Sequence, residues 1–137
     1  MAEETLTGLV EVSKEEARLM LETGYVYMEM GKFREAEQVL DGVVALLPRS
    51  EAPLIALGNL FSAQGRMDKA LTSYQNAIKI SPDSAAAHAF LGETLLLSKK
   101  YDEALPLLNK ACQLDSNEGP AFAHADSLLR AHEQGAF

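Results

Sequence analysis

The chain has 137 residues, of which 47% are hydrophobic and 23% charged, and this composition is typical of one globular domain rather than of a disordered chain. Its formal net charge is −8, and residues 1–16 alone hold five Glu against one Lys, so half of the excess acidity lies there. No segment is basic, which excludes nucleic acid and disfavours an anionic membrane surface, because both need Lys and Arg to neutralise phosphate.

Cysteine content and hydropathy indicate where the chain works. Cys112 is the single cysteine, so no internal disulfide is expected and a reducing compartment is favoured. The sequence begins Met-Ala-Glu-Glu, without the basic segment of a secretory signal, and no apolar run approaches the ~20 residues of a membrane-spanning helix. We therefore expect a soluble, cytoplasmic protein that is not inserted in a membrane.

The first sixteen residues carry weak local signals. Leu6, Leu9 and Val10 are spaced as on a helix, so residues 1–16 are interpreted as an N-terminal arm or a short helix. Ser13 and Glu16 then form the Ser-x-x-Glu pattern of a capping box, which predicts that a long helix begins here.

From this cap onward, apolar residues recur at steps of three and four, and short breaks separate the helical segments. A short turn separates the two helices within each expected pair, at Gly31-Lys32, Gly65-Arg66 and Lys99-Lys100. The first and second pairs end at Pro48 and Pro82, because proline does not continue a helix interior. The expected helices cover residues 13–30, 33–47, 51–64, 67–80, 84–98, 101–114 and 121–132.

The helix pairs repeat with a period of 34 residues. Gly24, Gly58 and Gly92 are each 34 apart, and so are the alanines at 36, 70 and 104. Small residues at fixed positions are required where the two helices of a pair cross closely. A fixed period of this length is the signature of a stacked helical repeat, in which neighbouring units bury each other's apolar faces.

The second unit resembles the tetratricopeptide repeat (TPR) family. The residues that carry this resemblance are Leu54, Leu57, Gly58, Phe61, Ala70, Tyr74, Ala77 and Pro82. The first unit departs from the pattern at Thr23, and the third has Leu95, Leu108 and Ser116 where aromatic residues and Pro are commoner.

The resemblance implies an all-α fold: a right-handed TPR superhelix, or α-solenoid, of three helix-turn-helix repeats with a C-terminal capping helix. It implies a single TPR domain over residues 17–134, with repeats at 17–50, 51–84 and 85–118 and a capping helix at 119–134.

No catalytic, cofactor-binding or metal-binding constellation is expected. His88 falls in a packing position of the repeat, and His124 and His132 are eight residues apart with no cysteine near them. Cys112 has no basic neighbour at helical spacing and is interpreted as a buried structural thiol. An enzyme is therefore the disfavoured interpretation.

In the TPR family the first helix of each pair lines a concave groove, so the resemblance implies which residues face a partner. Leu21, Tyr25 and Phe90 stand where heat-shock chaperone clamps of the family carry basic or amide side chains, which argues against such a clamp. Ala56 and Leu96 stand at the same offsets in their repeats and are also expected to line the groove. The expected partner-binding groove consists of Leu21, Tyr25, Met28, Ile55, Asn59, Ala63, Ala89, Phe90 and Glu93.

An apolar groove of this kind suits an amphipathic helix or an extended apolar peptide of another protein. The leading hypothesis is a protein–protein interaction module, a small TPR adaptor or chaperone. In size, acidity and repeat number the chain also resembles the small TPR chaperones of bacterial type III secretion. Two alternatives stay open: a self-assembling TPR scaffold whose terminal helices stack end to end as a homo-oligomer, or positions that only pack against the N-terminal arm or the next helix.

Overall fold

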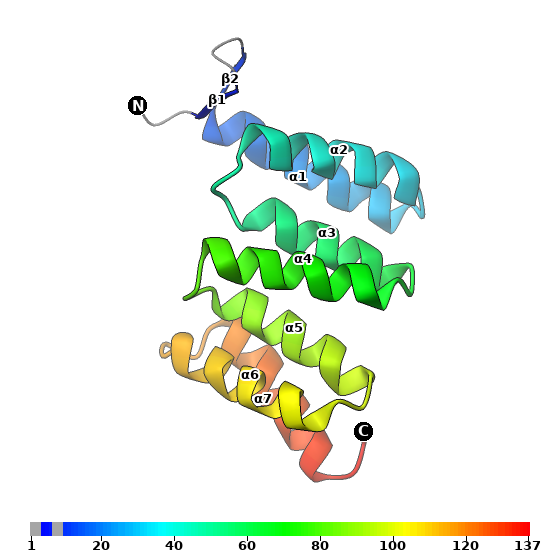
Figure 1. Cartoon of the computed structure of the whole chain (residues 1–137), viewed down its shortest axis with the longest axis vertical. Coiled ribbons are helices and arrows are strands. Elements are labelled where there is room, and N and C mark those ends of the chain that lie inside the picture. The colour runs from blue at the N-terminus through cyan, green and yellow to red at the C-terminus, as the bar shows by residue number, and fades with distance from the viewer. Residues whose placement is uncertain (1–3, 7–9) are drawn as a thin grey trace.

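The computed structural model describes residues 4–6 and 10–137, and their side chains from Val12 onward. In this part of the chain a β-hairpin is followed by helices that lie in antiparallel pairs, stacked one pair upon the next from the N-terminal to the C-terminal end (Figure 1). The helices are α1 (Lys14–Glu29), α2 (Phe33–Leu46), α3 (Ala52–Ala63), α4 (Met67–Ile80), α5 (Ala85–Leu97), α6 (Tyr101–Leu114) and α7 (Pro120–Glu133). The all-α prediction of three helix-turn-helix units and a C-terminal helix is confirmed.

Helix α1 begins at the expected capping box. The Glu16 backbone N–H donates to Ser13 Oγ at 3.1 Å, and the Ser13 N–H donates to Glu16 Oε1 at 3.3 Å. Each helix pair is joined by a residue in the left-handed region: Gly31 and Gly65, both at φ 75°, and Lys99 at φ 63° in the third pair. These three positions are again 34 residues apart, so the turn keeps one geometry even where glycine is absent.

The glycine positions of the repeat are where paired helices approach most closely. A Cβ added to Gly24 or Gly92 would lie 2.7 Å from a side-chain carbon of Leu40 or Leu108, and one added to Gly58 would overlap the Tyr74 ring. The second helix of each pair thus places a large side chain against the glycine of the first. This contact sets the spacing of each pair and explains the 34-residue column.

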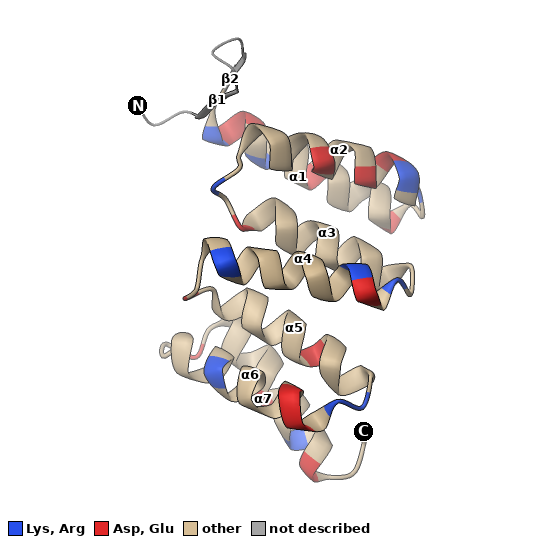
Figure 2. Ribbon diagram, in the orientation of Figure 1, with Lys and Arg blue, Asp and Glu red and all other residues tan. Residues whose placement is uncertain are grey.

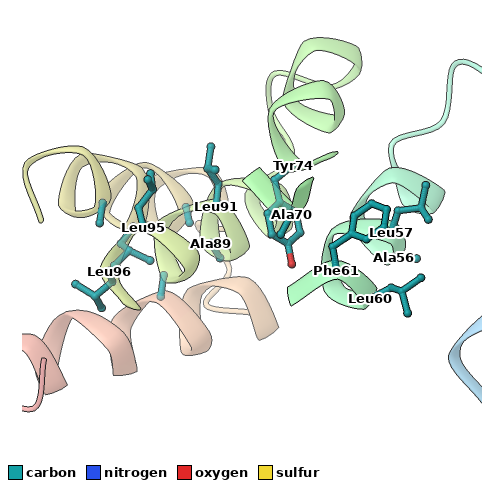
Figure 3. Packing of buried hydrophobic residues seen from close by; sticks show 14 of the residues in the cluster. Ala56, Leu57, Leu60, Phe61, Ala70, Tyr74, Ala89, Leu91, Leu95 and Leu96 are labelled. Carbon is teal, nitrogen blue, oxygen red and sulfur yellow. The ribbon is translucent and has the colours of Figure 1, made fainter. Parts of the chain in front are cut away.

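The core runs through the stack between successive pairs. Tyr74 and Ala70 of α4 lie between the α3 side chains, such as Phe61, and the α5 side chains, such as Leu91 (Figure 3). Helix α3 carries no charged residue and α5 carries only Glu93, whereas α1 and α2 are richly charged (Figure 2). The two central first helices are therefore apolar on most sides because neighbouring pairs cover them.

The N-terminal residues differ from one of the two expected arrangements. A short helix within residues 1–16 is not what the described residues form: β1 (Glu4–Leu6) pairs antiparallel with β2 (Val10–Val12), with Glu4 opposite Val12. Apolar and charged residues alternate from Val10 to Val12, which is the period of a strand and not of a helix. Leu9, on which the helical spacing relied, lies outside the described residues.

Helix α1 also starts at Lys14, so its first turn falls inside the segment that was assigned to the arm. Among the helices of the described ranges, none is both long and apolar enough to cross a membrane.

Candidate partner-binding face

Three polar residues one repeat apart, Tyr25, Asn59 and Glu93, lie on the same side of successive first helices. The Asn59 side chain joins three helices: its Nδ2 donates to the Tyr25 hydroxyl at 3.3 Å, and its Oδ1 accepts from the Tyr74 hydroxyl at 2.6 Å. The amide thus uses both of its ends within the chain. It ties α1 and α4 to α3 and fixes two aromatic rings on one face.

Aromatic contacts continue this line toward the C-terminal end. The Tyr74 ring is stacked on Phe90 with centroids 5.8 Å apart and an interplanar angle of 12°. Phe90 in turn contacts His124 of α7 at 5.4 Å, and His124 Nε2 lies 3.4 Å from Glu93 Oε1. We call the series Tyr25, Asn59, Tyr74, Phe90 and His124 the aromatic ladder; it crosses every helix pair of the array.

The Tyr74 hydroxyl stays protonated in this setting. Burial raises the pKa of Tyr74 most, and the nearby Glu93 carboxylate and the Tyr25 hydroxyl raise it further. A neutral phenol is a hydrogen-bond donor, so its short bond to Asn59 is maintained at every physiological pH. The ladder is therefore a fixed surface rather than one that titrates at Tyr74.

A small apolar pocket opens beside the ladder, between α5 and α7. Its volume is about 120 Å³. Four of its six lining residues are Ala or Pro, so the space exists because the side chains around it are short. Its walls are Ala86, Ala89, Phe90, Pro120, Ala121 and His124. A pocket with this lining accommodates an apolar side chain and offers nothing to a charged one.

The expected groove residues fall into two classes. Tyr25 is 38% exposed and Ala63 is also exposed, while Asn59 and Glu93 are half-buried members of the polar column. Half-buried apolar side chains that also pack on the core are those of Leu21, Met28, Ile55 and Phe90.

Three alanine and leucine positions behave differently from the expectation. Ala56 and Leu96 are fully buried at 0% exposure and do not line a groove, because α4 and α6 cover those sides of α3 and α5. Ala89 is also buried, at 1% exposure, yet it forms a wall of the small pocket. The face is consequently narrower than the sequence suggested.

Comparison with known proteins agrees with this architecture. The sequence profile described as tetratricopeptide repeat matches residues 55–118. Residues 55–118 of the chain therefore belong to the tetratricopeptide repeat family. Among curated proteins, no sequence matches the chain.

Solved TPR structures share the whole fold. The type III secretion translocator chaperone SycD of Yersinia enterocolitica is 22% identical, with a TM-score of 0.81 over 93% of this chain and 97% of that one. SycD in complex with a peptide of the translocator YopD is also 22% identical, with a TM-score of 0.75 over 91% and 98%. The Sgt2 TPR domain of Aspergillus fumigatus is 19% identical, with a TM-score of 0.74 over 90% and 83%.

Two members of this TPR face were missed by sequence reasoning, namely Tyr74 and His124. Tyr74 was assigned only to packing, yet its hydroxyl reaches Asn59. His124 stands 34 residues after Phe90, so extending the repeat register into residues 119–134 would have placed it on the same face.

Other side chains of the TPR chain that could carry chemistry are accounted for by packing. His88 is 7% exposed, with Nδ1 2.8 Å from the Ser84 carbonyl oxygen, as expected for a packing histidine. Cys112 is half-buried rather than buried, and burial together with Asp126 and Asp115 raises the pKa of its thiol. Over residues 4–6 and 10–137, no three His, Cys, Asp or Glu side chains are grouped as metal ligands.

Proposed function

We propose that this TPR protein is a small adaptor or chaperone that holds an apolar helical or extended segment of another protein. The observation that carries the proposal is the aromatic ladder with its small pocket, which joins every helix pair into one preformed face. Preformed aromatic faces bind without a large ordering cost. A cytoplasmic location is part of the proposal, because a chaperone meets its partner there before export or assembly.

The chemistry of the face favours an apolar ligand over a carboxylate. Both ends of the Asn59 amide already bond to tyrosines, which leaves at most one N–H for a chain terminus. The one charged column residue near the pocket is the anionic Glu93. Both features oppose a negatively charged peptide end, whereas an aliphatic side chain fits the pocket beside Phe90.

Type III secretion is the pathway that we propose. Its support is the similarity in fold and in length to SycD, whose structure has also been solved with a peptide of the translocator YopD. The Aspergillus fumigatus domain shows that the fold alone does not select a pathway, so the proposal needs its own test.

The face is tested with a displayed library of apolar peptides selected on the wild-type protein. Binding of the selected peptides should fall at least about 30-fold in Phe90→Glu and in Ala89→Trp, which fills the pocket, because hot-spot positions lose roughly 2 kcal/mol or more. Ile80→Glu, at an exposed apolar residue away from the ladder, is the matched control and should leave binding unchanged. Peptides that bind Phe90→Glu as well as wild type would place the binding face elsewhere.

The pathway is tested separately with the YopD peptide as the probe, by fluorescence anisotropy. Micromolar binding that Phe90→Glu abolishes would support a translocator chaperone. Absence of binding, with the library peptides still bound, would remove the secretion assignment and keep the adaptor.

A further inference from the structure

Helix α1 carries an apolar stripe on a side that faces neither the core nor the ladder. Among residues with described side chains, six large hydrophobic ones are exposed, and four of them belong to α1 and its C-cap. Leu19, Val26 and Met30 are 59%, 53% and 58% exposed. With Thr23 they recur at steps of four, three and four residues, so all four share one face of the helix. We call these four residues the stripe.

The repeat register shows what this face does elsewhere in the array. One repeat after Leu19, Thr23 and Val26, the same positions hold buried residues, namely Pro53, Leu57 and Leu60. Two repeats on they are again buried, as Ala87, Leu91 and Thr94. On α3 and α5 the preceding helix pair covers this face.

Before α1 the described residues form only the hairpin, which leaves the stripe exposed. The stripe is thus a surface of the inter-repeat kind without the helix that covers it elsewhere. Large exposed apolar patches of this kind mark interfaces.

The stripe also has the relief of a helix-packing surface. An open hollow of about 370 Å³ lies on it, lined by Leu19, Glu22, Thr23, Val26 and Tyr27. The first four have the spacing i, i+3, i+4 and i+7, which is the diamond of four residues that receives one side chain of a facing helix. The Thr23 hydroxyl donates to the Leu19 carbonyl oxygen at 2.8 Å, so the hollow can be covered without burying an unpaired donor.

Glutamates border the stripe along one side. Glu15, Glu22 and Glu29 are seven residues apart, and all three fall at position g of the heptad in which the stripe residues occupy positions a and d. We call these three residues the acidic ridge. Arg18 lies 2.7 Å from Glu15 and 4.0 Å from Glu22, so one guanidinium stands against three carboxylates.

The acidic ridge belongs to the first repeat alone. Acidic residues lie along α1, whereas α3 has none (Figure 2). One repeat after Glu22 and Glu29 come Ala56 and Ala63, and two repeats after them come Phe90 and Leu97. Helix α1 therefore combines an uncovered packing face with a charge pattern that the inner helices lack.

We propose that the stripe binds one amphipathic helix of a different protein, whose Lys or Arg side chains lie along the acidic ridge. The heptad spacing of stripe and ridge selects a helix as the occupant. The diamond-shaped hollow selects a large aliphatic side chain on that helix. The three glutamates select basic residues beside it, and opposite charges at such flanking positions set partner choice in helix pairs. The partner helix would take the place that a preceding repeat takes on α3.

A second copy of the chain offers the acidic ridge no cation. In an antiparallel pair of α1 helices, the g positions of one helix lie along the g positions of the other, so glutamates would face glutamates. In a parallel pair, Glu15 and Glu22 would face Met20 and Tyr27. The net charge of −8 on each chain also opposes self-association, whereas it attracts a basic helix.

The probe is a synthetic peptide of four heptads with Leu at positions a and d and Lys at positions e and g. Lysines on both sides of its apolar seam suppress pairing of the peptide with itself. Its matched control has Glu at the same e and g positions. With the full chain, fluorescence anisotropy should show micromolar binding of the basic peptide and at least about 30-fold weaker binding of the acidic one. Raising NaCl from about 50 to 500 mM should weaken the basic complex about tenfold, because the ridge is exposed.

Substitutions in the stripe locate the contact. Val26→Glu and Leu19→Glu should each weaken binding of the basic peptide at least about 30-fold, because each places a charge in the apolar seam. Both residues are exposed, so circular dichroism should show unchanged helix content. Leu97→Glu, at an apolar residue of α5 that is 51% exposed, is the matched control and should leave this binding unchanged.

Reversing the ridge tests the charge selection. Glu22→Lys combined with Glu29→Lys should weaken the basic peptide at least about tenfold and make the acidic peptide the tighter of the two. Glu35→Lys combined with Glu103→Lys changes the net charge equally at exposed sites on α2 and α6 and should keep the preference for the basic peptide. An unchanged preference in the ridge variant would overturn the proposal.

Sedimentation of the full chain with the basic peptide should give one peptide per chain. A chain that instead associates with itself through Leu19 and Val26, and excludes the peptide, would assign the stripe to a second copy and overturn the proposal. Equal binding of both peptides, or binding that survives Leu19→Glu with Val26→Glu, would overturn it as well.

The inference does not rest on the partner-binding face. Val26→Glu should abolish binding of the basic peptide and leave peptide binding at the ladder intact, while Phe90→Glu should do the opposite. A failure of either proposal is thus visible while the other stands.

Discussion

The two ends of the stack are built on one 34-residue register and have opposite surfaces. At the C-terminal end, α7 places Ala125, at 0% exposure, in the column of Leu57 and Leu91, and turns Ser127 and Arg130 outward. At the N-terminal end the same column holds Thr23, which is exposed. One end is therefore finished with a polar helix, whereas the other keeps an apolar face. The difference teaches that a departure from the repeat pattern marks a surface rather than a defect.

The largest difference in stability should come from shortening the side chain at one repeat position, in the third repeat and in the first. Leu91→Ala should lower the free energy of unfolding by roughly 3 kcal/mol, because it leaves a cavity between α5 and the preceding pair. Thr23→Ala should change it by less than about 0.5 kcal/mol, since nothing covers that side chain in a single chain. Urea denaturation measures the free energy of unfolding of both variants, at a protein concentration where each is a single chain. Equal losses would mean that the first repeat is covered as the third is.

Removing the caps of the two terminal helices should have a smaller effect on stability than the Leu91 substitution. Asp115 Oδ2 accepts from the Phe122 N–H at 3.0 Å and so holds the start of α7, while Ser13 caps α1. Asp115→Ala and Ser13→Ala should each cost about 1 kcal/mol. Amide exchange should then speed up in α7 alone for the first variant and in α1 alone for the second. Asp115→Asn keeps an acceptor oxygen and is the control; spread of the effect through all helices would contradict independent ends.

The smallest effect should come from restoring the repeat pattern at the open end. Thr23→Leu adds apolar area to the stripe without touching the core, so single-chain stability should stay within about 0.5 kcal/mol. Urea denaturation measures the change. A gain or loss above about 1 kcal/mol would show that position 23 is covered in the single chain.

Much of the fold could be predicted from the sequence because its signals are local and repeated. The Ser13–Glu16 box, the glycine turns and the columns of Gly58 and Tyr74 each fix backbone geometry within one helix pair. The hairpin was missed because each strand has only three residues. An alternation of apolar and polar residues over so short a stretch is weaker than the helical spacing of Leu6, Leu9 and Val10.

The candidate face was predicted only in part. Tyr25, Asn59, Phe90 and Glu93 belong to one connected surface, but helical spacing does not reveal how far neighbouring helices cover a side chain. Ala56 was therefore expected in the groove although α4 covers it. Tyr74 was overlooked because it has two roles: its ring stacks on Phe90 and its hydroxyl donates to Asn59. Helical spacing predicts only the packing role of a residue.

The buried hydrogen bond of Tyr74 gives the protein a built-in optical reporter. The chain has no Trp and only four Tyr, so its near-ultraviolet absorbance comes mainly from these phenols. Because burial raises the pKa of Tyr74, its phenolate should form only above the ordinary pH range of a tyrosine in an alkaline titration. The rise in phenolate absorbance that belongs to Tyr74 therefore reports on the centre of the aromatic ladder. Any ligand seated there should shift that step without a label being attached.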